Sequence, residues 1–264
     1  MGVNRREFLK IAGLSTLAGL GGRSAFELLA PGEIEAREEP LSKGKTWGMV
    51  IDMHKMDDAL VEKCIEACHR THNVPNIGNP KEEVKWLWKD TYHHTFTGRE
   101  NEYLSEEVEE MHFLLLCNQC TNPPCVRVCP TKATFKREDG IVIMDMHRCI
   151  GCRFCMAACP YGSRSFNWGD PNKAPEPLNP DWPTNREYPT RSMGVVEKCN
   201  FCAERLAKGQ IPACVEAAEK EAEGAMVFGD LADPESEIRE ALRANYTIRR
   251  KPELGTGPNV FYVI

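Results

Sequence analysis

The chain has 264 residues, enough for one or two compact domains. Its 33 lysine and arginine residues are nearly balanced by 39 aspartate and glutamate residues. The chain therefore lacks the basic excess typical of nucleic-acid binding, and nothing in its charge favours a polyanionic partner. The unusual number is 13 cysteines. They are clustered along the chain, which indicates metal binding.

The first segment in chain order is a predicted export signal. Paired Arg5 and Arg6 precede Phe-Leu-Lys, and a mildly apolar run follows over residues 11–20. This combination is typical of a twin-arginine signal, and the run is shorter than the ~20 residues that cross a bilayer. The alternative is a short amphipathic helix that opens a cytosolic protein. We predict a signal and linker over 1–36 and a location on the extracytoplasmic (periplasmic) face of the cytoplasmic membrane.

Beyond this signal, hydrophobic patterning and turn residues predict both helices and strands. A proline-rich stretch over 170–189 is predicted to lack regular structure, and the tail to Ile264 is expected to pack on the body. The predicted elements are a strand over 47–52, a helix over 57–69, a loop over 73–79, a strand over 86–96, strands over 133–135 and 141–144 around a turn at 138–140, a helix carrying Cys214, a strand over 225–228 and a helix over 235–245.

Two cysteine blocks form an internal repeat, and each ends in Cys-Pro. The first has the spacing Cys-x2-Cys-x4-Cys-x3-Cys-Pro, and the second has Cys-x2-Cys-x2-Cys-x3-Cys-Pro. The second spacing is that of bacterial ferredoxins, in which three cysteines bind one [4Fe–4S] cluster and the fourth binds its neighbour. The blocks consist of Cys117, Cys120, Cys125 and Cys129, and of Cys149, Cys152, Cys155 and Cys159.

Zinc and disulfides are the two other uses of such cysteines. Zinc sites usually pair two Cys-x2-Cys motifs that are a dozen or more residues apart, which the contiguous blocks do not match. Disulfides suit an exported protein, but 13 is an odd number and such dense runs are poor frameworks for bridges. Iron–sulfur binding is therefore the stronger prediction.

Two further groups of cysteines flank the repeat. Cys199, Cys202 and Cys214 follow it, while Cys64 and Cys68 precede it. A histidine comes directly after the second cysteine of the earlier pair, which is close to the attachment motif of c-type haem. That motif has two residues between its cysteines, where this chain has three. Covalent haem is therefore the weaker interpretation.

From about residue 47 to its C-terminus, the chain resembles the four-cluster iron–sulfur subunits of the dimethyl-sulfoxide-reductase type. The resemblance rests on the two Cys-Pro blocks, on Val-Glu-Lys-Cys at 196–199 and on Val-Phe-Gly-Asp-Leu at 227–231. It implies an α+β fold of two bacterial-ferredoxin-like units of the βαββαβ type, one inserted in the other, with long irregular loops. The implied parts are an outer unit over 45–116 and 195–231, an inserted unit over 117–168, the proline-rich insertion over 169–194 and a C-terminal extension over 232–264.

The resemblance also implies how cysteines from different blocks combine. In this family, three ligands from one block share a cluster with the last cysteine of its partner block. Carried over to this sequence, the pairing gives three complete ligand sets, which we call sites 1 to 3. Site 1 comprises Cys117, Cys120, Cys125 and Cys159; site 2 comprises Cys149, Cys152, Cys155 and Cys129; site 3 comprises Cys199, Cys202, Cys214 and Cys68.

The family's fourth site is where this sequence departs from the pattern. Its ligands should include the residue four positions after the last cysteine of site 3, which is Ala218. Two others fall near Met56 or Asp58 and at Val61, so only Cys64 remains. We therefore expect three [4Fe–4S] clusters, with Cys64 as an unpaired remnant. The alternative is a fourth metal centre built from Cys64 and a neighbouring side chain, which could be Asp57, Asp58 or a histidine.

The expected function is electron relay, because each such cluster changes by one electron and a row of clusters acts as a wire. The chain has no phosphate loop, nucleophile elbow or dinucleotide fingerprint, so we expect no catalytic site of its own. The paired arginines, residues 68–75 and the reduced first cysteine group resemble the extracytoplasmic iron–sulfur subunit of heterodisulfide-reductase-like menaquinol oxidoreductases, the sulfite-reduction-associated membrane complexes.

That resemblance implies two partners and no nucleic acid. One partner is an integral-membrane quinol-interacting subunit, with menaquinol as the donor. The other is a multihaem cytochrome c or another redox subunit. The alternatives are the iron–sulfur subunit of a polysulfide-, tetrathionate- or nitrite-reductase-type complex, and a free exported ferredoxin-like shuttle.

Overall fold

The computed structural model describes residues 45–99, 102–171, 185–189 and 191–264. The predicted signal over 1–36, with Arg5 and Arg6, lies outside these residues, as do residues 172–184 of the proline-rich insertion. All of the described residues belong to one compact unit. The elements described below all belong to it.

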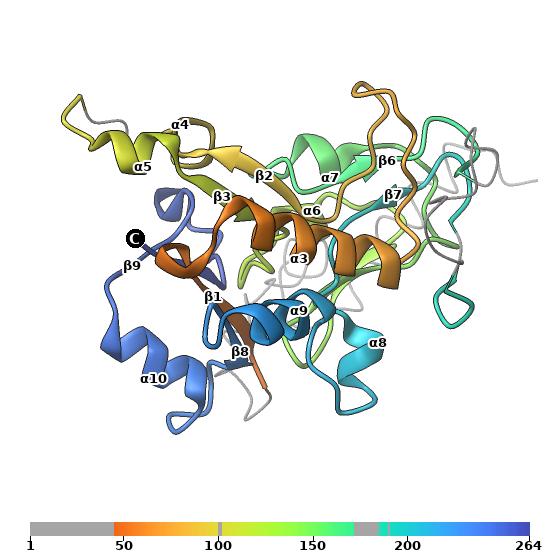
Figure 1. Ribbon diagram of the computed structural model, residues 1–264. Coiled ribbons are helices and arrows are strands. Elements are labelled where there is room, and N and C mark those ends of the chain that lie inside the picture. The colour runs from red at the N-terminus through yellow and green to blue at the C-terminus, as the bar shows by residue number, and fades with distance from the viewer. Residues whose placement is uncertain (1–44, 100–101, 172–184, 190) are drawn as a thin grey trace, which may run out of the picture. The chain divides into compact units, whose positions relative to one another are not determined.

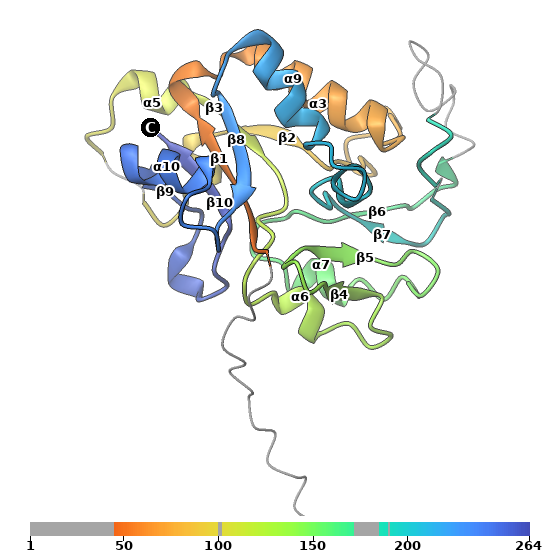
Figure 2. The same ribbon diagram turned by 90° about the horizontal axis from the view of Figure 1, so that it is seen from below.

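The largest sheet has four strands: β1 (Trp47–Asp52), β8 (Met226–Asp230), β9 (Thr247–Ile248) and β10 (Val260–Val263). β1 and β8 lie side by side in Figure 1, and the order of all four strands is β8–β1–β10–β9 (Figure 2). β1 pairs in parallel with β10 and antiparallel with β8. The strands predicted over 47–52 and 225–228 are thus present, and the C-terminal tail packs on the body by supplying a central strand.

Different helices cover the two faces of this sheet: α3 (Asp58–Thr71) and α9 (Ala213–Glu221) on one face, and α10 (Glu237–Ala244) on the other. Successive residues of a strand point to opposite faces. Accordingly, Met49 and Ile51 belong to the core that includes α3 and α9, whereas Val50 packs with Ile238 of α10. Both faces of β1 are therefore buried, which explains its nearly continuous apolar sequence.

Helix α3 forms where a helix was predicted, shifted by one residue at its start and two at its end. The Asp57 side chain caps it by accepting a hydrogen bond from the Leu60 N–H at 2.7 Å. Its buried residues recur at the three- and four-residue spacing of an amphipathic helix, and two of them are Cys64 and Cys68. These cysteines therefore lie one turn apart on the buried side.

The segment 86–96, predicted as one strand, contains a strand β2 (Trp88–Thr91) and then a helical turn α4 (Tyr92–Thr95). β2 pairs with β3 (His112–Leu115), and α5 (Glu106–Glu110) lies between them in sequence. The strand prediction is wrong for its second half, because Tyr92 and Phe96 both contact Phe113, at ring-centroid distances of 6.0 and 5.2 Å. In a strand these two residues would be about 13 Å apart, too far to share one neighbour.

The cysteine repeat lies on short elements that gather away from the four-stranded sheet (Figure 2). The predicted hairpin is present, with strands that pair antiparallel around Gly140, whose φ of 81° suits the turn. The elements of this region are α6 (Pro124–Arg127), β4 (Thr134–Lys136), β5 (Val142–Met144), α7 (Phe154–Ala157), β6 (Ser165–Phe166), β7 (Val196–Glu197) and α8 (Ala203–Leu206), while the short 3-10 helices η1 (Met53–Lys55) and η3 (Pro252–Leu254) lie elsewhere.

The fold is thus a mixed α/β domain with several small sheets, as the sequence predicts. The insertion of one ferredoxin-like unit in another, with its boundaries, stays a prediction. Within the described residues, no helix has the length and apolar character needed to cross a membrane.

Candidate metal centres

The four cysteines of site 1 line a small cavity with about 340 Å³ of empty space. Pro123 and Pro124 form part of its wall, and Pro124 can begin α6 because the first helical N–H needs no partner. Burial, and after it the proximity of Cys117, raises the pKa of Cys120 to about 12. The cavity is therefore a place where thiolates need a compensating cation.

The four cysteines of site 2 line a second cavity with about 260 Å³ of empty space. This site lies closer to solvent, because all of its cysteines except Cys155 are half-buried. Although burial alone would raise the pKa of Cys129, hydrogen bonds outweigh it and lower the pKa. One of them is donated by the Thr134 N–H to the Cys129 Sγ at 3.4 Å.

Site 3 brings together cysteines from two helices and a loop. α3 carries Cys68, α9 carries Cys214, and Cys199 and Cys202 precede α8; all four are buried. Burial, and then the proximity of the other three thiols, raises the pKa of Cys68 well above its ordinary value. The pKa of Cys214 is raised in the same way, by burial and then by its neighbours. The four sulfurs therefore act on one another through a low-dielectric interior.

The Cys-x2-Cys pairs of the three sites share one backbone feature. The second residue between the cysteines has left-handed geometry in each pair: φ is 44° at Gln119, 70° at Gly151 and 54° at Phe201. This geometry is uncommon for residues other than glycine. Successive N–H groups in such turns face one side and form an anion-binding concavity. The backbone is thus shaped to donate hydrogen bonds to cluster sulfur.

Two buried cations lie among the cysteines, and neither was predicted from the sequence to have a role. Although burial lowers the pKa of Arg164, the neighbouring Cys125 and Cys155 thiolates raise it above its ordinary value. The Lys198 Nζ donates a hydrogen bond to the Cys199 carbonyl at 2.8 Å. A thiolate-bound cluster carries net negative charge, and charge and hydrogen bonds near the cluster set its potential. Lys198 adjoins a ligand in sequence, but only the fold reveals that it and Arg164 are buried.

Cys64 lies in a different environment from the cysteines of sites 1 to 3. It is fully buried, and its Sγ donates to the Cys214 carbonyl at 3.5 Å and lies 3.9 Å from the Met226 Sδ. Burial raises its pKa to about 12, so the thiol is neutral. Val61 and Ala218, two of the expected fourth-site positions, are buried in the same hydrophobic core. This region is packed as an ordinary protein interior.

The aspartates of the alternative fourth centre have other partners. Asp57 caps α3, and the Asp58 carboxylate lies 3.0 Å from the His112 Nδ1 at the surface. Neither arrangement adds a ligand to Cys64, so nothing in these contacts favours a fourth centre.

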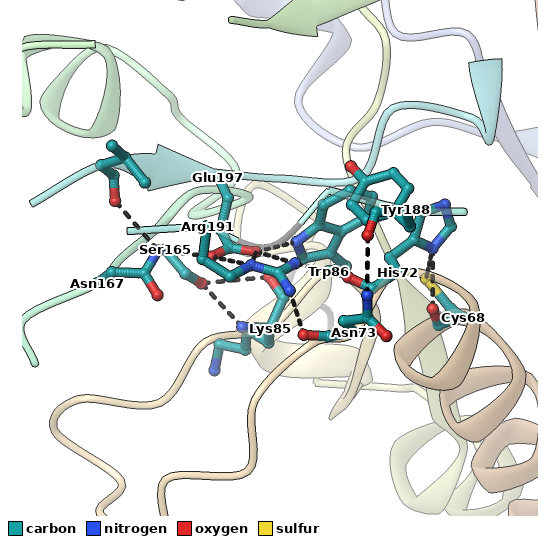
Figure 3. A network of polar contacts seen from close by, with 11 residues as sticks. Cys68, His72, Asn73, Lys85, Trp86, Ser165, Asn167, Tyr188, Arg191 and Glu197 are labelled. Atoms are coloured by element: carbon teal, nitrogen blue, oxygen red, sulfur yellow. Dashed lines mark hydrogen bonds and ion pairs between the residues drawn. The ribbon is translucent and has the colours of Figure 1, made fainter. Parts of the chain in front are cut away.

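A buried polar network lies beside site 3 (Figure 3). Arg191 and Glu197 are fully buried and form an ion pair at 2.7 Å. The Trp86 indole N–H donates to Glu197 at 2.7 Å, and Arg191 donates to the His72 carbonyl at 2.8 Å. The His72 ring stacks on Trp86 at 4.4 Å, and its Nδ1 lies 2.8 Å from the Cys68 carbonyl. The network therefore holds His72 in place, four residues after the proposed ligand Cys68.

Cysteine sites with ferredoxin spacing, carried on short helices and hairpins, define a protein of the [4Fe–4S] ferredoxin-like class. The family model described as a 4Fe-4S dicluster domain matches residues 108–175, which include every cysteine of sites 1 and 2. All 13 cysteines lie among the described residues, and none of them forms a disulfide there.

The chain is similar to iron–sulfur subunits of several oxidoreductases. It is 38% identical to the Hdr-like menaquinol oxidoreductase iron-sulfur subunit 1 of Archaeoglobus fulgidus, over 98% of this chain and 97% of the relative. It is 34% identical to the iron-sulfur cluster-binding subunit of menaquinone reductase from Nitratidesulfovibrio vulgaris, over 82% of this chain and 88% of the relative. It is also 34% identical to a tetrathionate reductase subunit of Salmonella typhimurium, over 100% of this chain and 89% of the relative.

The chain therefore belongs to the family of [4Fe–4S] electron-transfer subunits of the dimethyl-sulfoxide-reductase type. The family and the electron-transfer function predicted from the cysteine blocks are confirmed. The number of clusters and the ligand sets stay predictions.

Proposed function

We propose that this subunit relays single electrons through three [4Fe–4S] clusters, from a membrane quinol subunit that oxidises menaquinol to an extracytoplasmic redox partner such as a multihaem cytochrome c. The proposed ligands are the four cysteines of each of sites 1, 2 and 3. The clusters supply the one-electron chemistry when bound. The residues of the chain hold them, exclude water and set the charge around them.

The observation that carries this proposal is the order of the sites. Gln119, between Cys117 and Cys120 of site 1, donates a hydrogen bond from its Nε2 to the Cys199 carbonyl of site 3 at 3.0 Å. Cys125 of site 1 and Cys155 of site 2 belong to one small buried cluster. Site 1 thus adjoins both of the others. The order 3–1–2 is what a wire requires.

The buried cations support the same proposal. Arg164 acts on cysteines of both site 1 and site 2, so its charge is placed to stabilise reduced clusters at two neighbouring positions. Lys198 does the same beside site 3. An added electron in a low-dielectric interior is costly without such compensation.

Iron and sulfide analysis of anaerobically purified protein tests the number of clusters. Three clusters predict about 12 iron and about 12 sulfide per chain, and a fourth cluster would raise both to about 16. EPR spectra during a reductive titration should show cubane signals that interact magnetically. Colourless protein, or protein without such signals after reduction, would remove the basis of the proposal.

The choice of quinol and partner is supported by the relatives. The menaquinol oxidoreductase subunit is 38% identical over nearly the whole of both chains, whereas the tetrathionate reductase subunit is 34% identical over 100% of this chain and 89% of its own length. A polysulfide reductase relative from Wolinella succinogenes matches over 56% of this chain. When menadiol is added to anaerobic membranes that contain the complex, the absorbance of the clusters should decrease. A free shuttle would instead elute alone near its mass of 29.8 kDa, without haem or membrane subunits.

Export by the twin-arginine route is the remaining part of the proposal, and it rests on Arg5 and Arg6. Replacing both with lysine should leave cluster-loaded protein in the cytoplasm. Fractionation with antibody detection measures this. Unchanged export of the double variant would contradict the route without affecting the clusters.

A further inference from the structure

Exposed apolar side chains gather over site 2. Ile150, Phe154, Trp168 and Met193 are 66, 60, 47 and 62% exposed. They are four of the nine large apolar side chains that are exposed in the described part of the chain. Single exposed apolar residues are ordinary, but a contiguous group often marks an interaction surface.

These side chains form one surface. The Arg153 guanidinium lies 4.6 Å from the centre of the Trp168 ring, and Ile150 and Arg153 both line the site 2 cavity. A Cβ atom on Gly151 would clash with the Gly194 carbonyl oxygen, so the loops on either side of the surface touch. We call Ile150, Phe154, Trp168, Met193 and Arg153 together the site 2 face.

The ligands of site 2 reach closer to solvent than those of site 3. Cys129, Cys149 and Cys152 are half-buried, whereas all four cysteines of site 3 are buried. Site 2 also lies at one end of the proposed order of clusters. An electron that crosses the molecule therefore enters or leaves most directly through the site 2 face.

Positive charge surrounds this face. Residues 117–168 contain seven lysine or arginine residues and three aspartate or glutamate residues, although the whole chain has a net charge of −6. Exposed Arg127, Lys132 and Arg148 lie within three residues of the ligands Cys129 and Cys149. A partner that fits this face needs apolar residues at its centre and carboxylates at its edge.

We propose that the site 2 face is the docking surface for the next protein of the electron-transfer chain, a redox protein whose contact surface is apolar and edged with carboxylates. The inference rests on the proposed function. Apolar contact excludes water between the two redox groups, and the cations orient the partner. Aromatic and basic residues also suit an anionic bilayer. A protein is favoured, because the face adjoins a proposed cluster and the electron needs an acceptor held in a fixed position.

The test compares two sets of variants of the full chain in its native membranes. The double variant Phe154→Ala/Trp168→Ala removes the aromatic centre of the face. The control is Tyr246→Ala, which removes a side chain that is 74% exposed just after α10. Menadiol is added to anaerobic membranes, and reduction and reoxidation of the clusters are followed by absorbance. Iron content and cluster potentials are measured on the same samples.

The double variant should slow reoxidation by the acceptor about tenfold, as truncation of central interface residues does, and leave reduction by menadiol unchanged. This result supports docking of the acceptor, provided that iron content and potentials are unchanged and the control behaves as wild type. Slowed reduction with normal reoxidation would assign the face to the quinol subunit and overturn the inference. Arg127→Glu should slow reoxidation at low salt and flatten its dependence on ionic strength.

Three further results would overturn the inference. In the first, the wild type transfers electrons and the double variant matches it. In the second, Tyr246→Ala slows transfer equally. In the third, the purified protein binds phosphatidylglycerol vesicles through these two aromatics, which would make the bilayer the occupant. If menadiol fails to reduce the wild-type clusters in membranes, the proposed function itself fails, and this inference falls with it.

Discussion

Helices α3 and α9 contribute to two buried regions that lie within one turn of each other: site 3 and the hydrophobic core around Cys64. Cys68 and Cys214 join two further thiols in site 3, where burial and mutual repulsion raise their pKa values. Burial alone raises the pKa of Cys64, one turn before Cys68, although this thiol shares a buried core with Val61, Ala218 and Cys214. The helices, their packing and their depth are shared. Only the number of thiols differs.

The contrast shows what separates a metal centre from a hydrophobic core. A single buried thiol stays protonated and packs as a small apolar group. Four buried thiols cannot all ionise without a cation among them, so their convergence is favourable only when metal binds. The predicted loss of three ligands from the fourth site would therefore favour repacking of that site with apolar residues, and burial of Val61 and Ala218 in the core that holds Cys64 is consistent with it.

The largest expected effect comes from removing a thiol of site 3, with removal of Cys64 as the comparison. Cys214→Ala should lower the iron content from about 12 to about 8 per chain, because a cubane with three protein ligands at a buried site is not retained. Cys64→Ala should leave the content unchanged. Iron and sulfide analysis measures both. Equal losses in the two variants would mean that Cys64 also binds metal.

A smaller effect is expected from the buried ion pair beside site 3. Arg191→Met leaves the Glu197 charge buried without its partner, which typically costs about 3–5 kcal/mol. The urea concentration at which the cluster absorbance is lost should fall. The matched control is Lys63→Ala, because the ion pair of Lys63 with Glu221 joins α3 to α9 at a half-exposed surface. Its cost should stay below about 1 kcal/mol, and a similar shift in both variants would contradict the expectation.

The next effect in size concerns the indole that supports the same pair. Trp86→Phe keeps most of the ring but removes the N–H that donates to Glu197 at 2.7 Å. A buried carboxylate that loses one donor costs about 1–3 kcal/mol. Trp168→Phe, at an exposed position, is the control and should not move the urea midpoint. A midpoint for Trp86→Phe equal to wild type would indicate that another group satisfies the carboxylate.

The smallest expected effect is the lack of thiol reactivity at Cys64. With a pKa of about 12, this thiol is protonated at neutral pH and should not react with iodoacetamide in the native protein. Unfolded chains ionise it near pH ~8.5. As the pH rises from there toward the folded pKa, the unfolded state loses a proton that the folded state keeps, so stability falls. Cys64→Ala should weaken that fall, and mass spectrometry of alkylated peptides tests the reactivity.

Much of the local structure was predictable because it depends on neighbours in sequence. The strand over 47–52, the helix with Cys64 and Cys68 and the hairpin around Gly140 follow from apolar spacing, an aspartate cap and a glycine turn. The structure of segment 86–96 was not predictable, because residues four apart, such as Tyr92 and Phe96, lie on the same face of a strand and also of a helix. Their shared contact with Phe113, a residue of another strand, selects the helix.

The sequence alone determined the class of cofactor and the family, because cysteine spacing fixes how many thiolates one short loop can present to a metal. Only the tertiary structure decided where buried charge lies. Charged residues usually lie at the surface, so the sequence alone predicts exposure for Arg164, Lys198 and the Arg191–Glu197 pair. They lie at the cysteine sites only because segments distant in sequence bury them. Burial is a property of the whole packed chain, and for this reason no local pattern encodes it.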